Sequence, residues 1–315
     1  MPKTVEKGSD PVPVQILEVG PRDGLQNESA LVPLAEKIAF VDRLTAAGHT
    51  RIEVSAFVSP TWVPQLADAA EVFAGITRHP GVRYSALVPN PKGLERAIAC
   101  GVTEVAIFAA ASETFSRKNI NQSIDESLVN YAEVTRLARA AGVTVRGYLS
   151  TCFGCPFEGD VAVDRVADLT RRLLDIGVYE VAVSDTIGIA HPGQVRAVLS
   201  VLRPLFTPDQ LALHFHDTRG TALANVLASL DFGITTFDSS AGGLGGCPYA
   251  PGALGNVATE DLLYMLHGLG HVTGVSIDAL TDASLALEPS ISRRLPSRYV
   301  NAVRSRRGSA SPDPA

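Results

Sequence analysis

The chain has 315 residues, of which 46% are hydrophobic and 19% are charged, and its formal net charge is −6 at pH 7. This composition is typical of a globular protein that is long enough to bury a large core. The mildly acidic balance and the lack of a basic run argue against nucleic acid or an anionic membrane surface as the main partner. The sequence also lacks the run of about 18 apolar residues that a membrane-spanning helix needs.

The two ends of the chain read as extensions. Residues 1–13 lack the apolar core of a signal peptide and contain the acidic residues that transit peptides avoid, so we expect a cytoplasmic protein. Residues 301–315 are predicted to be a disordered tail. Of the four cysteines, Cys152 and Cys155 have the spacing of half a redox or zinc motif. A second pair is missing, which favours structural thiols.

Between the ends, strand-like and helix-like patterns alternate. Helical patterns such as Leu34–Ala47 and Ser127–Ala141 stop at a glycine, and a strand follows within a few residues. Eight strands, each followed by a helix, predict one (β/α)8 TIM barrel in residues 14–300, with its core at about 14–266 and added C-terminal helices. An open doubly wound sheet would leave one strand unplaced, and its glycine fingerprint is missing. The predicted strands are Val14–Val19, Arg51–Phe57, Arg83–Val88, Glu104–Ala109, Thr144–Ser150, Glu180–Ser184, Leu211–Phe215 and Thr235–Ser239.

Two histidines at the end of the seventh predicted strand suggest a metal site. His214 and His216 are two residues apart, so on a strand both point to the same face. The alternative is a pair of loop histidines satisfied by hydrogen bonds. Asp23 follows the first strand and would meet them at the rim of a barrel, although it could also cap a helix or pair with Arg22. One carboxylate, two imidazoles and an amide oxygen suit Mg²⁺ or Mn²⁺, with Zn²⁺, Co²⁺ or Fe²⁺ as alternatives.

Other reactive side chains follow strands at the same predicted rim. Arg22 could stabilise an enolate or grip a carboxylate or phosphate. Glu53 lies within an apolar strand, where a carboxylate needs a partner, and an ion pair with Arg22 would supply one. Asp185 ends the sixth strand and could act as a base or cap the next helix. Cys247 lies in a glycine-rich loop, where it is either a catalytic thiol or an incidental small residue.

Two long motifs resemble those of the 3-hydroxy-3-methylglutaryl-CoA lyase family. One is Glu-Val-Gly-Pro-Arg-Asp-Gly-Leu-Gln-Asn-Glu at 18–28, and the other is Gly-Leu-Gly-Gly-Cys-Pro-Tyr-Ala-Pro-Gly-Ala-Leu-Gly-Asn at 243–256. Shorter matches lie in order between them, at 52–60, 118–121, 145–148, 184–188 and 214–218. The resemblance implies a TIM-barrel metallolyase related to isopropylmalate and homocitrate synthases. It would cleave 3-hydroxy-3-methylglutaryl-CoA to acetyl-CoA and acetoacetate, as in leucine degradation, and would be a homodimer.

The resemblance also implies roles for individual residues. It assigns Asp23, His214, His216 and Asn256 as metal ligands, and Arg22, Glu53, Asp185, Cys247 and His214 as catalytic residues. It assigns Arg22, Gln26, Lys118 and Asn119 to binding of the acyl-CoA substrate.

The sequence departs from the family at two positions near the rim. Ser29 stands where lysine is common, and Arg219 replaces an aromatic residue. Both could alter which acyl group is accepted. The alternatives are therefore a lyase for a longer, branched 3-hydroxy-3-alkylglutaryl-CoA, a synthase working in the condensation direction, and a non-catalytic scaffold.

Overall fold

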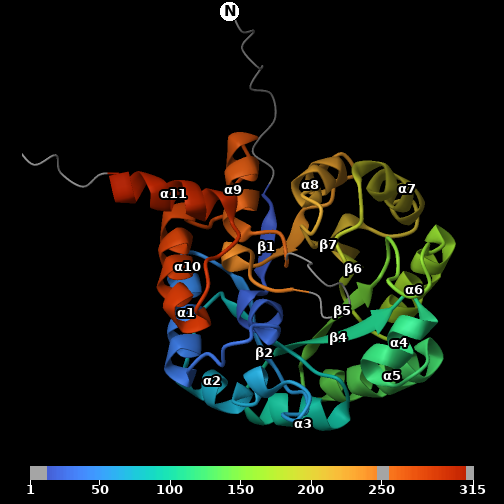
Figure 1. The fold of residues 1–315 in the computed structure, drawn as a ribbon. Helices are drawn as coiled ribbons and strands as arrows, with labels where there is room; N and C mark the ends of the chain where they lie inside the picture. The colour runs from blue at the N-terminus through green and yellow to red at the C-terminus, as the bar shows by residue number, and fades with distance from the viewer. Residues whose placement is uncertain (1–12, 247–254, 310–315) are drawn as a thin grey trace, which may run out of the picture.

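The computed structural model describes residues 13–246 and 255–309. Eight parallel strands follow one another in sequence order around a closed barrel, with β1 paired to β8, and helices surround them (Figure 1). The predicted (β/α)8 barrel is confirmed, and each predicted strand agrees with an observed one to within one residue at either end. The strands are β1 Gln15–Glu18, β2 Arg51–Ala56, β3 Arg83–Leu87, β4 Glu104–Ala110, β5 Thr144–Ser150, β6 Val181–Asp185, β7 Leu211–Phe215 and β8 Thr236–Ser239.

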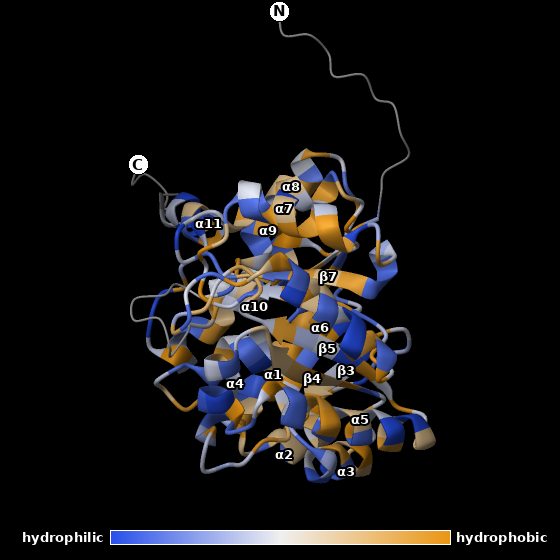
Figure 2. Ribbon diagram, turned by 90° about the vertical axis from the view of Figure 1, so that its right-hand side faces the viewer, coloured by the Kyte–Doolittle hydropathy of each residue, from blue (hydrophilic) through white to orange (hydrophobic). Residues whose placement is uncertain are grey.

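The helices pack their apolar faces on the outside of this barrel and turn polar residues outward (Figure 2). Several of them stop where a glycine takes up a positive φ, as at Gly48 (φ 103°) after α1, a conformation that favours glycine. The helices are α1 Leu34–Ala46, α2 Ala69–Gly75, α3 Pro91–Ala99, α4 Glu113–Ile120, α5 Ile124–Ala140, α6 Val163–Asp175, α7 Pro192–Leu202, α8 Ala222–Leu230, α9 Thr259–Gly268, α10 Ile277–Ile291 and α11 Arg298–Ser309.

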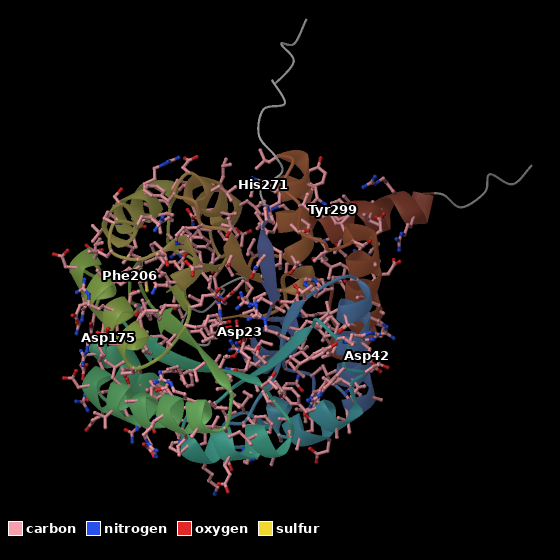
Figure 3. All side chains as sticks on the ribbon, turned by 180° about the vertical axis from the view of Figure 1, so that it is seen from behind. Asp23, Asp42, Asp175, Phe206, His271 and Tyr299 are labelled. Carbon is pink, nitrogen blue, oxygen red and sulfur yellow. The ribbon has the colours of Figure 1, made fainter. Side chains whose placement is uncertain are left out.

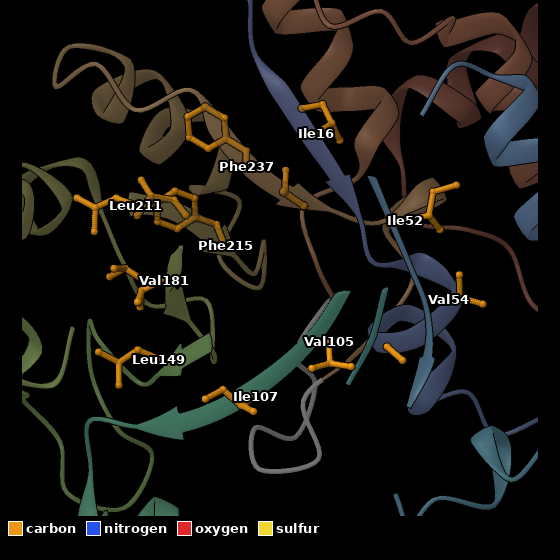
Figure 4. Close-up of a cluster of buried hydrophobic side chains, with 14 of the residues drawn as sticks. Ile16, Ile52, Val54, Val105, Ile107, Leu149, Val181, Leu211, Phe215 and Phe237 are labelled. Atoms are coloured by element: carbon orange, nitrogen blue, oxygen red, sulfur yellow. The ribbon is translucent and has the colours of Figure 1, made fainter. Parts of the chain in front are cut away.

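The strands are buried on both faces, as expected in a parallel barrel. Side chains on the outer face, among them Ile52, Val105 and Phe215, point away from the barrel and fill the layer beneath the helices (Figure 4). The alternate residues point inward, and several of these are charged.

The inward-facing charges form a buried network. Arg146 on β5 donates to Asp238 on β8 at 2.8 and 3.2 Å and to Glu180 at 2.5 Å. Arg51 on β2 donates to Glu180 at 2.9 and 3.1 Å. Removing one partner from such a network leaves an uncompensated buried charge, which typically costs about 3–5 kcal/mol. The network thus ties strands from different sides of the barrel together beneath the carboxyl-terminal rim.

The C-terminal region corrects one prediction. Helix α11 runs to Ser309, so the predicted disorder is wrong for residues 301–309. Arg304 of α11 pairs with Glu288 of α10, and Arg307 pairs with Asp282, so these contacts order the basic segment whose sequence resembles a free tail. Residues 310–315 and 1–12 lie outside the described residues. No helix of the described part of the chain is long and apolar enough to cross a membrane.

Candidate active site and metal centre

A cavity of about 810 Å³ opens at the carboxyl ends of the strands. This is the face on which a (β/α)8 barrel carries its chemistry. Arg22, Asp23, His214 and His216 line it. Asp23 lies near the centre of the ring of helices, whereas side chains such as Asp175 lie at the periphery (Figure 3). The structure therefore brings residues from opposite ends of the sequence into one site.

Arg22 and Asp23 lie on a single turn of π-helix, η1 (Gly20–Gly24), directly after β1. The backbone N–H groups of Arg22, Asp23 and Gly24 all point to the carbonyl of Val19, at 3.1, 2.8 and 3.1 Å. Such turns are rare in proteins overall, and those that do occur are often found at functional sites. This tight turn directs two adjacent side chains, one cationic and one anionic, into the cavity.

Asp23, His214 and His216 form a cluster that could hold a metal ion. Their potential ligand atoms all lie within 4.8 Å of one another. The predicted fourth ligand, Asn256, lies beside them, because His216 and Asn256 form an isolated backbone bridge and the Asn256 amide donates to Asp23 at 2.8 Å. The four predicted ligands are thus adjacent in space, although they come from three separate strand-to-helix junctions.

The electrostatics of the cluster suit a cation. Burial opposes ionisation of Asp23, but Arg22 and the two histidines outweigh it and lower the pKa of Asp23 to about 2. Burial, aided by His214, lowers the pKa of His216 to about 4. At neutral pH the site therefore presents a carboxylate and a neutral imidazole, the protonation states that metal ligands require.

Unpartnered polar atoms also indicate a place for an ion. Among the described residues, Asn256 Oδ1 and His216 Nδ1 are buried without a hydrogen-bond partner. Buried polar atoms are nearly always paired, so such exceptions often mark the place of an ion or a water molecule. The oxygen, nitrogen and carboxylate donors of the cluster fit a divalent cation.

His214 has a carboxylate partner on its far side. Its Nδ1 lies 3.3 Å from Asp238, which is held in turn by Arg146. Asp238 is ionised, because Arg146 and His214 outweigh burial and lower its pKa. An anion at Nδ1 favours the tautomer that leaves Nε2 as the ligand atom.

Replacing Asp238 with asparagine tests this arrangement. The amide cannot supply the negative charge that fixes the His214 tautomer, so we expect metal affinity to fall by about 10- to 100-fold. Competition with a fluorescent chelator measures that affinity directly. An unchanged dissociation constant would show that Asp238 does not orient His214.

Arg22 is held on several sides. Its Nε donates to Glu53 and its Nη1 donates to Asp23 at 2.6 Å. The Tyr148 hydroxyl also donates to Glu53, and the Arg22 guanidinium lies over the Tyr148 ring, 5.3 Å from its centroid. These contacts raise the pKa of Arg22, despite its burial. The predicted ion pair between Glu53 and Arg22 is present, and the result is a fixed cation at the wall of the cavity.

Tyr148 and Asp238 are site residues that the sequence predictions missed. The side chains of Tyr148 and Asp238 point into the barrel. Tyr148 lies two residues after Arg146 on β5, so Tyr148 and Arg146 share one face of that strand. A polar residue at alternate positions of an otherwise apolar strand was the available signal. This pattern does not reveal which residue each polar side chain contacts, because that residue lies on another strand.

Asp185 lies at the end of β6 and is 1% exposed. Its two carboxylate oxygens accept hydrogen bonds from the backbone of Ile189 and Ala190, both at 3.0 Å. Both groups lie in the turn before α7, whose N-cap is His191, so the alternative that Asp185 caps this helix is wrong. Burial raises the pKa of Asp185 to about 6. Its neighbours Ser184 and Thr186 line the cavity, whereas Asp185 is not among the lining residues. Asp185 therefore holds the turn that precedes α7, and a role as base stays a proposal.

The other predicted substrate-binding residues divide into two groups. Gln26 and Asn119 line the cavity. Lys118 does not line it in the described structure, and its ammonium group lies 4.2 Å from the centre of the Phe157 ring. Lys118 thus directly precedes the lining residue Asn119 but contacts Phe157, which does not line the cavity.

The two departures from the family also differ in position. Ser29 lines the cavity, where it can contact substrate. Arg219 instead donates to the carbonyls of Ile187 and Gly188, at 3.3 and 2.9 Å, and holds the turn after β6. An effect of Arg219 on the substrate would therefore pass through that turn.

Cys247 lies outside the described residues, but both stems of its loop are described. Gly245 and Gly255 pack so closely that a Cβ on Gly255 would lie 2.5 Å from the Gly245 carbonyl carbon. Asn27 donates to the carbonyl of Gly246 at 3.1 Å, and Asp217 donates its backbone N–H to the Gly255 carbonyl at 3.0 Å. The loop therefore leaves and rejoins the barrel at the rim.

Glu18 is a further buried carboxylate, and it holds the backbone of two loops at the site. Glu18 accepts hydrogen bonds from the backbone of Gly20 and Ala241, both at 2.8 Å, and from Thr259 at 2.7 Å. Nε2 of the buried His49 lies 3.7 Å from it. Burial raises the pKa of Glu18 from 4.5 to about 8 and lowers that of His49 to about 3.

These values predict how stability depends on pH. Between pH 4.5 and about 8 the folded protein keeps a proton on Glu18 that the unfolded chain releases. The contribution of Glu18 to the free energy of unfolding should therefore fall by about 1.4 kcal/mol for each pH unit as the pH rises. Glu18→Gln should remove that part of the slope in urea unfolding experiments. Parallel pH profiles for the two proteins would contradict the prediction.

Comparison with known proteins places the chain in a family. The HMGL-like family model matches residues 13–286. The mitochondrial hydroxymethylglutaryl-CoA lyase of Bos taurus is 51% identical over 300 residues, which is 95% of this chain and 92% of the relative. A Pseudomonas aeruginosa protein named 3-hydroxy-3-isohexenylglutaryl-CoA/hydroxy-methylglutaryl-CoA lyase is 55% identical over 273 residues, covering 87% and 91%.

A solved structure agrees. An HMG-CoA lyase from Acinetobacter baumannii, in complex with coenzyme A and 3-methylmalate, superposes with a TM-score of 0.89 at 39% identity, covering 96% of this chain and 98% of that one. With the family model matching most of the barrel, and with relatives near 50% identity over nearly their full lengths, the chain belongs to the HMGL-like family and is a lyase.

Proposed function

We propose that this enzyme cleaves 3-hydroxy-3-methylglutaryl-CoA to acetyl-CoA and acetoacetate. The observation that carries the proposal is the fixed Arg22 guanidinium beside the cluster of Asp23, His214 and His216, at the rim of a barrel whose relatives have this activity. The cleavage needs a group that takes the proton of the 3-hydroxyl. It also needs a site for the negative charge that develops on the thioester.

The bond that breaks joins C2 and C3 of the acyl group. When the 3-hydroxyl loses its proton, its oxygen becomes the ketone of acetoacetate and the electron pair of the bond passes to the thioester enolate. Asp185 is the proposed base, with His214 as the alternative, because an imidazole that binds a metal is a poor base. Arg22 stabilises the enolate oxygen, an effect typically worth about 100- to 1,000-fold in rate.

Two further residues complete the proposed chemistry. Glu53 keeps Arg22 oriented, since it accepts the Nε–H and is itself held by Tyr148. Cys247 protonates the enolate carbon to give acetyl-CoA, a role that rests on the family resemblance of its loop. The reaction consumes no net proton, because one proton leaves the 3-hydroxyl and one proton is added to the enolate carbon.

A bound divalent cation would polarise the 3-hydroxyl and orient the substrate. Asp23, His214, His216 and Asn256 are the proposed ligands, and their oxygen and imidazole donors favour Mg²⁺ or Mn²⁺. Gln26, Asn119 and Lys118 are proposed to contact the acyl-CoA. A cytoplasmic location, a part in leucine degradation and a homodimeric state stay predictions. Sedimentation of the purified protein tests the last of these.

A product assay tests the proposed function. Purified enzyme incubated with 3-hydroxy-3-methylglutaryl-CoA should release acetoacetate and acetyl-CoA in equal amounts. The same incubation with free acetoacetate and acetyl-CoA should show no loss of thioester, which would distinguish this lyase from a synthase working toward condensation. Absence of acetoacetate at every enzyme concentration would refute the proposal.

A further inference from the structure

Residues 28–33, which we call the rim segment, join η1 to α1 at the edge of the cavity. The segment is neither helix nor strand, and its residues Ser29 and Leu31 line the cavity. Among the described residues, Ala30 and Val32 of this segment make no backbone–backbone hydrogen bond. A segment of this kind keeps one shape only if side chains satisfy its buried backbone groups.

The side chain of Gln65 supplies the missing hydrogen bonds. Its Oε1 accepts the backbone N–H of Val32 at 3.0 Å, and its Nε2 donates to the carbonyl of Ala30 at 2.9 Å. Gln65 lies in the short helix η2 (Pro64–Leu66), which follows β2, and is 3% exposed. Water therefore cannot replace the amide, and losing it would leave buried backbone groups unpaired.

The backbone of Gln65 is itself fixed. Its carbonyl accepts a hydrogen bond from the ammonium group of Lys37 on α1, which also donates to both carboxylate oxygens of Asp68, at 2.8 and 2.9 Å. Lys37 is buried, and a buried lysine needs partners of this kind. The Gln65 amide is thus held in place before substrate arrives, so binding does not have to order it.

The rim segment presents one apolar side chain to the cavity. Val32 is 4% exposed and packs in the main core, whereas Leu31 is 68% exposed and lines the cavity. Val32 therefore anchors the segment on the inside, and Leu31 offers apolar surface to a bound ligand. Because Leu31 lies at the exposed edge, it is suited to the coenzyme A portion of the substrate rather than to the reacting end.

The reacting end is held by other contacts. Arg22 and Asp23 are fixed by the π-helical turn η1, and Arg22 is held by Glu53, which accepts a hydrogen bond from Tyr148. None of these contacts involves the Gln65 side chain. Loosening the rim segment should therefore weaken substrate binding and leave the chemical step unchanged.

We infer that Gln65 is a positioning residue, which holds the rim segment so that Leu31 contacts the coenzyme A portion of the bound substrate. This inference rests on the proposed function and adds two residues to it. Leu31 touches the substrate, and Gln65 acts through Leu31. Neither residue takes part in breaking the C2–C3 bond.

Gln65→Leu tests the inference, because it removes both hydrogen bonds at nearly the same side-chain size. The KM for 3-hydroxy-3-methylglutaryl-CoA should rise about tenfold, and kcat should stay within about twofold of the wild-type value. A general loss of folded enzyme would instead lower kcat and leave KM unchanged.

Gln210→Leu is the matched control. The Gln210 side chain also accepts a hydrogen bond from a loop backbone, that of Thr207 at 3.0 Å. Gln210 directly precedes β7 and so lies at the end of the barrel opposite the cavity. Its replacement should change neither KM nor kcat.

Binding can also be measured without turnover. Trp62 is the single tryptophan of the chain, and it lines the cavity three residues before Gln65. Quenching of its fluorescence by coenzyme A therefore gives a dissociation constant. We expect this constant to rise about tenfold in Gln65→Leu, in parallel with KM.

A double-mutant cycle shows whether Gln65 acts through Leu31. Leu31→Ala should raise KM about five- to tenfold in the wild-type background. In the Gln65→Leu background it should raise KM less than about twofold, since a misplaced side chain has little contact left to lose. Additive effects of the two substitutions would overturn the inference.

The outcomes separate the inference from the proposed function. If the wild-type enzyme does not cleave the thioester, the proposed function fails. If the wild-type enzyme is active and Gln65→Leu keeps the wild-type KM, the inference is overturned and the proposed function stands. An unchanged KM in Leu31→Ala overturns it as well. Should Gln65→Leu fail to fold, Gln65→Glu takes its place under the same criterion, because it keeps the acceptor for Val32 and loses the donor for Ala30.

Discussion

Asp23→Ala should abolish metal binding and lower turnover about 1,000-fold or more, because a catalytic metal contributes several kcal/mol to the transition state and each 1.36 kcal/mol is tenfold in rate. Asp23 supplies the carboxylate of the cluster, and its low pKa keeps it charged at every pH of interest. Removing it leaves two imidazoles and an amide, with no negative charge to offset a divalent cation. Elemental analysis and acetoacetate release measure the two effects.

The control for this variant removes a carboxylate elsewhere. Asp175 lies at the periphery of the barrel, at the end of α6, and is exposed (Figure 3). Asp175→Ala should keep its metal and its turnover. A full metal content in Asp23→Ala would exclude Asp23 as a ligand, whatever its activity.

Arg22→Gln should lower kcat about 100- to 1,000-fold while leaving metal content unchanged. It should also destabilise the protein by about 3–5 kcal/mol, since the buried carboxylate of Glu53 loses its charged partner. Arg22→Lys keeps the charge but not the planar guanidinium that contacts both Glu53 and Asp23, so it should recover only part of the activity.

A second substitution separates the two effects of Arg22. In the double variant Arg22→Gln, Glu53→Gln the fully buried carboxylate of Glu53 is no longer left without its cation, so most of the lost stability should return. Turnover should stay low, because the cation that faces the enolate is still missing. Recovery of turnover together with stability would show that Arg22 acts only as a structural partner of Glu53.

The fold could be predicted from the sequence because its elements carry local signals. Each strand is a short apolar run and several helices end at a glycine, so the barrel follows from counting the repeats. The prediction failed at α11, whose polar sequence resembles a tail. Ion pairs with α10 hold this helix in place, and such tertiary contacts leave no trace in a local pattern.

The site could be predicted only in part. His214 and His216 were placed together by strand geometry, and Arg22 and Asp23 joined them once the strands formed a barrel. The roles of Tyr148 and Asp238 depend on side chains from other strands, namely Glu53 and Arg146, and which strand faces which residue across a barrel is set by stagger and packing. The π-helical turn after β1 is likewise a tertiary feature.

The most direct test of the metal centre is a titration of metal-free enzyme. Protein stripped with a chelator should cleave 3-hydroxy-3-methylglutaryl-CoA at no more than about a thousandth of the full rate. Added Mn²⁺ should restore turnover in proportion to the metal bound. Turnover should reach its maximum when one ion is bound per chain, at the cluster of Asp23, His214 and His216. Full turnover by enzyme shown to be free of metal would contradict a catalytic role for an ion at this cluster.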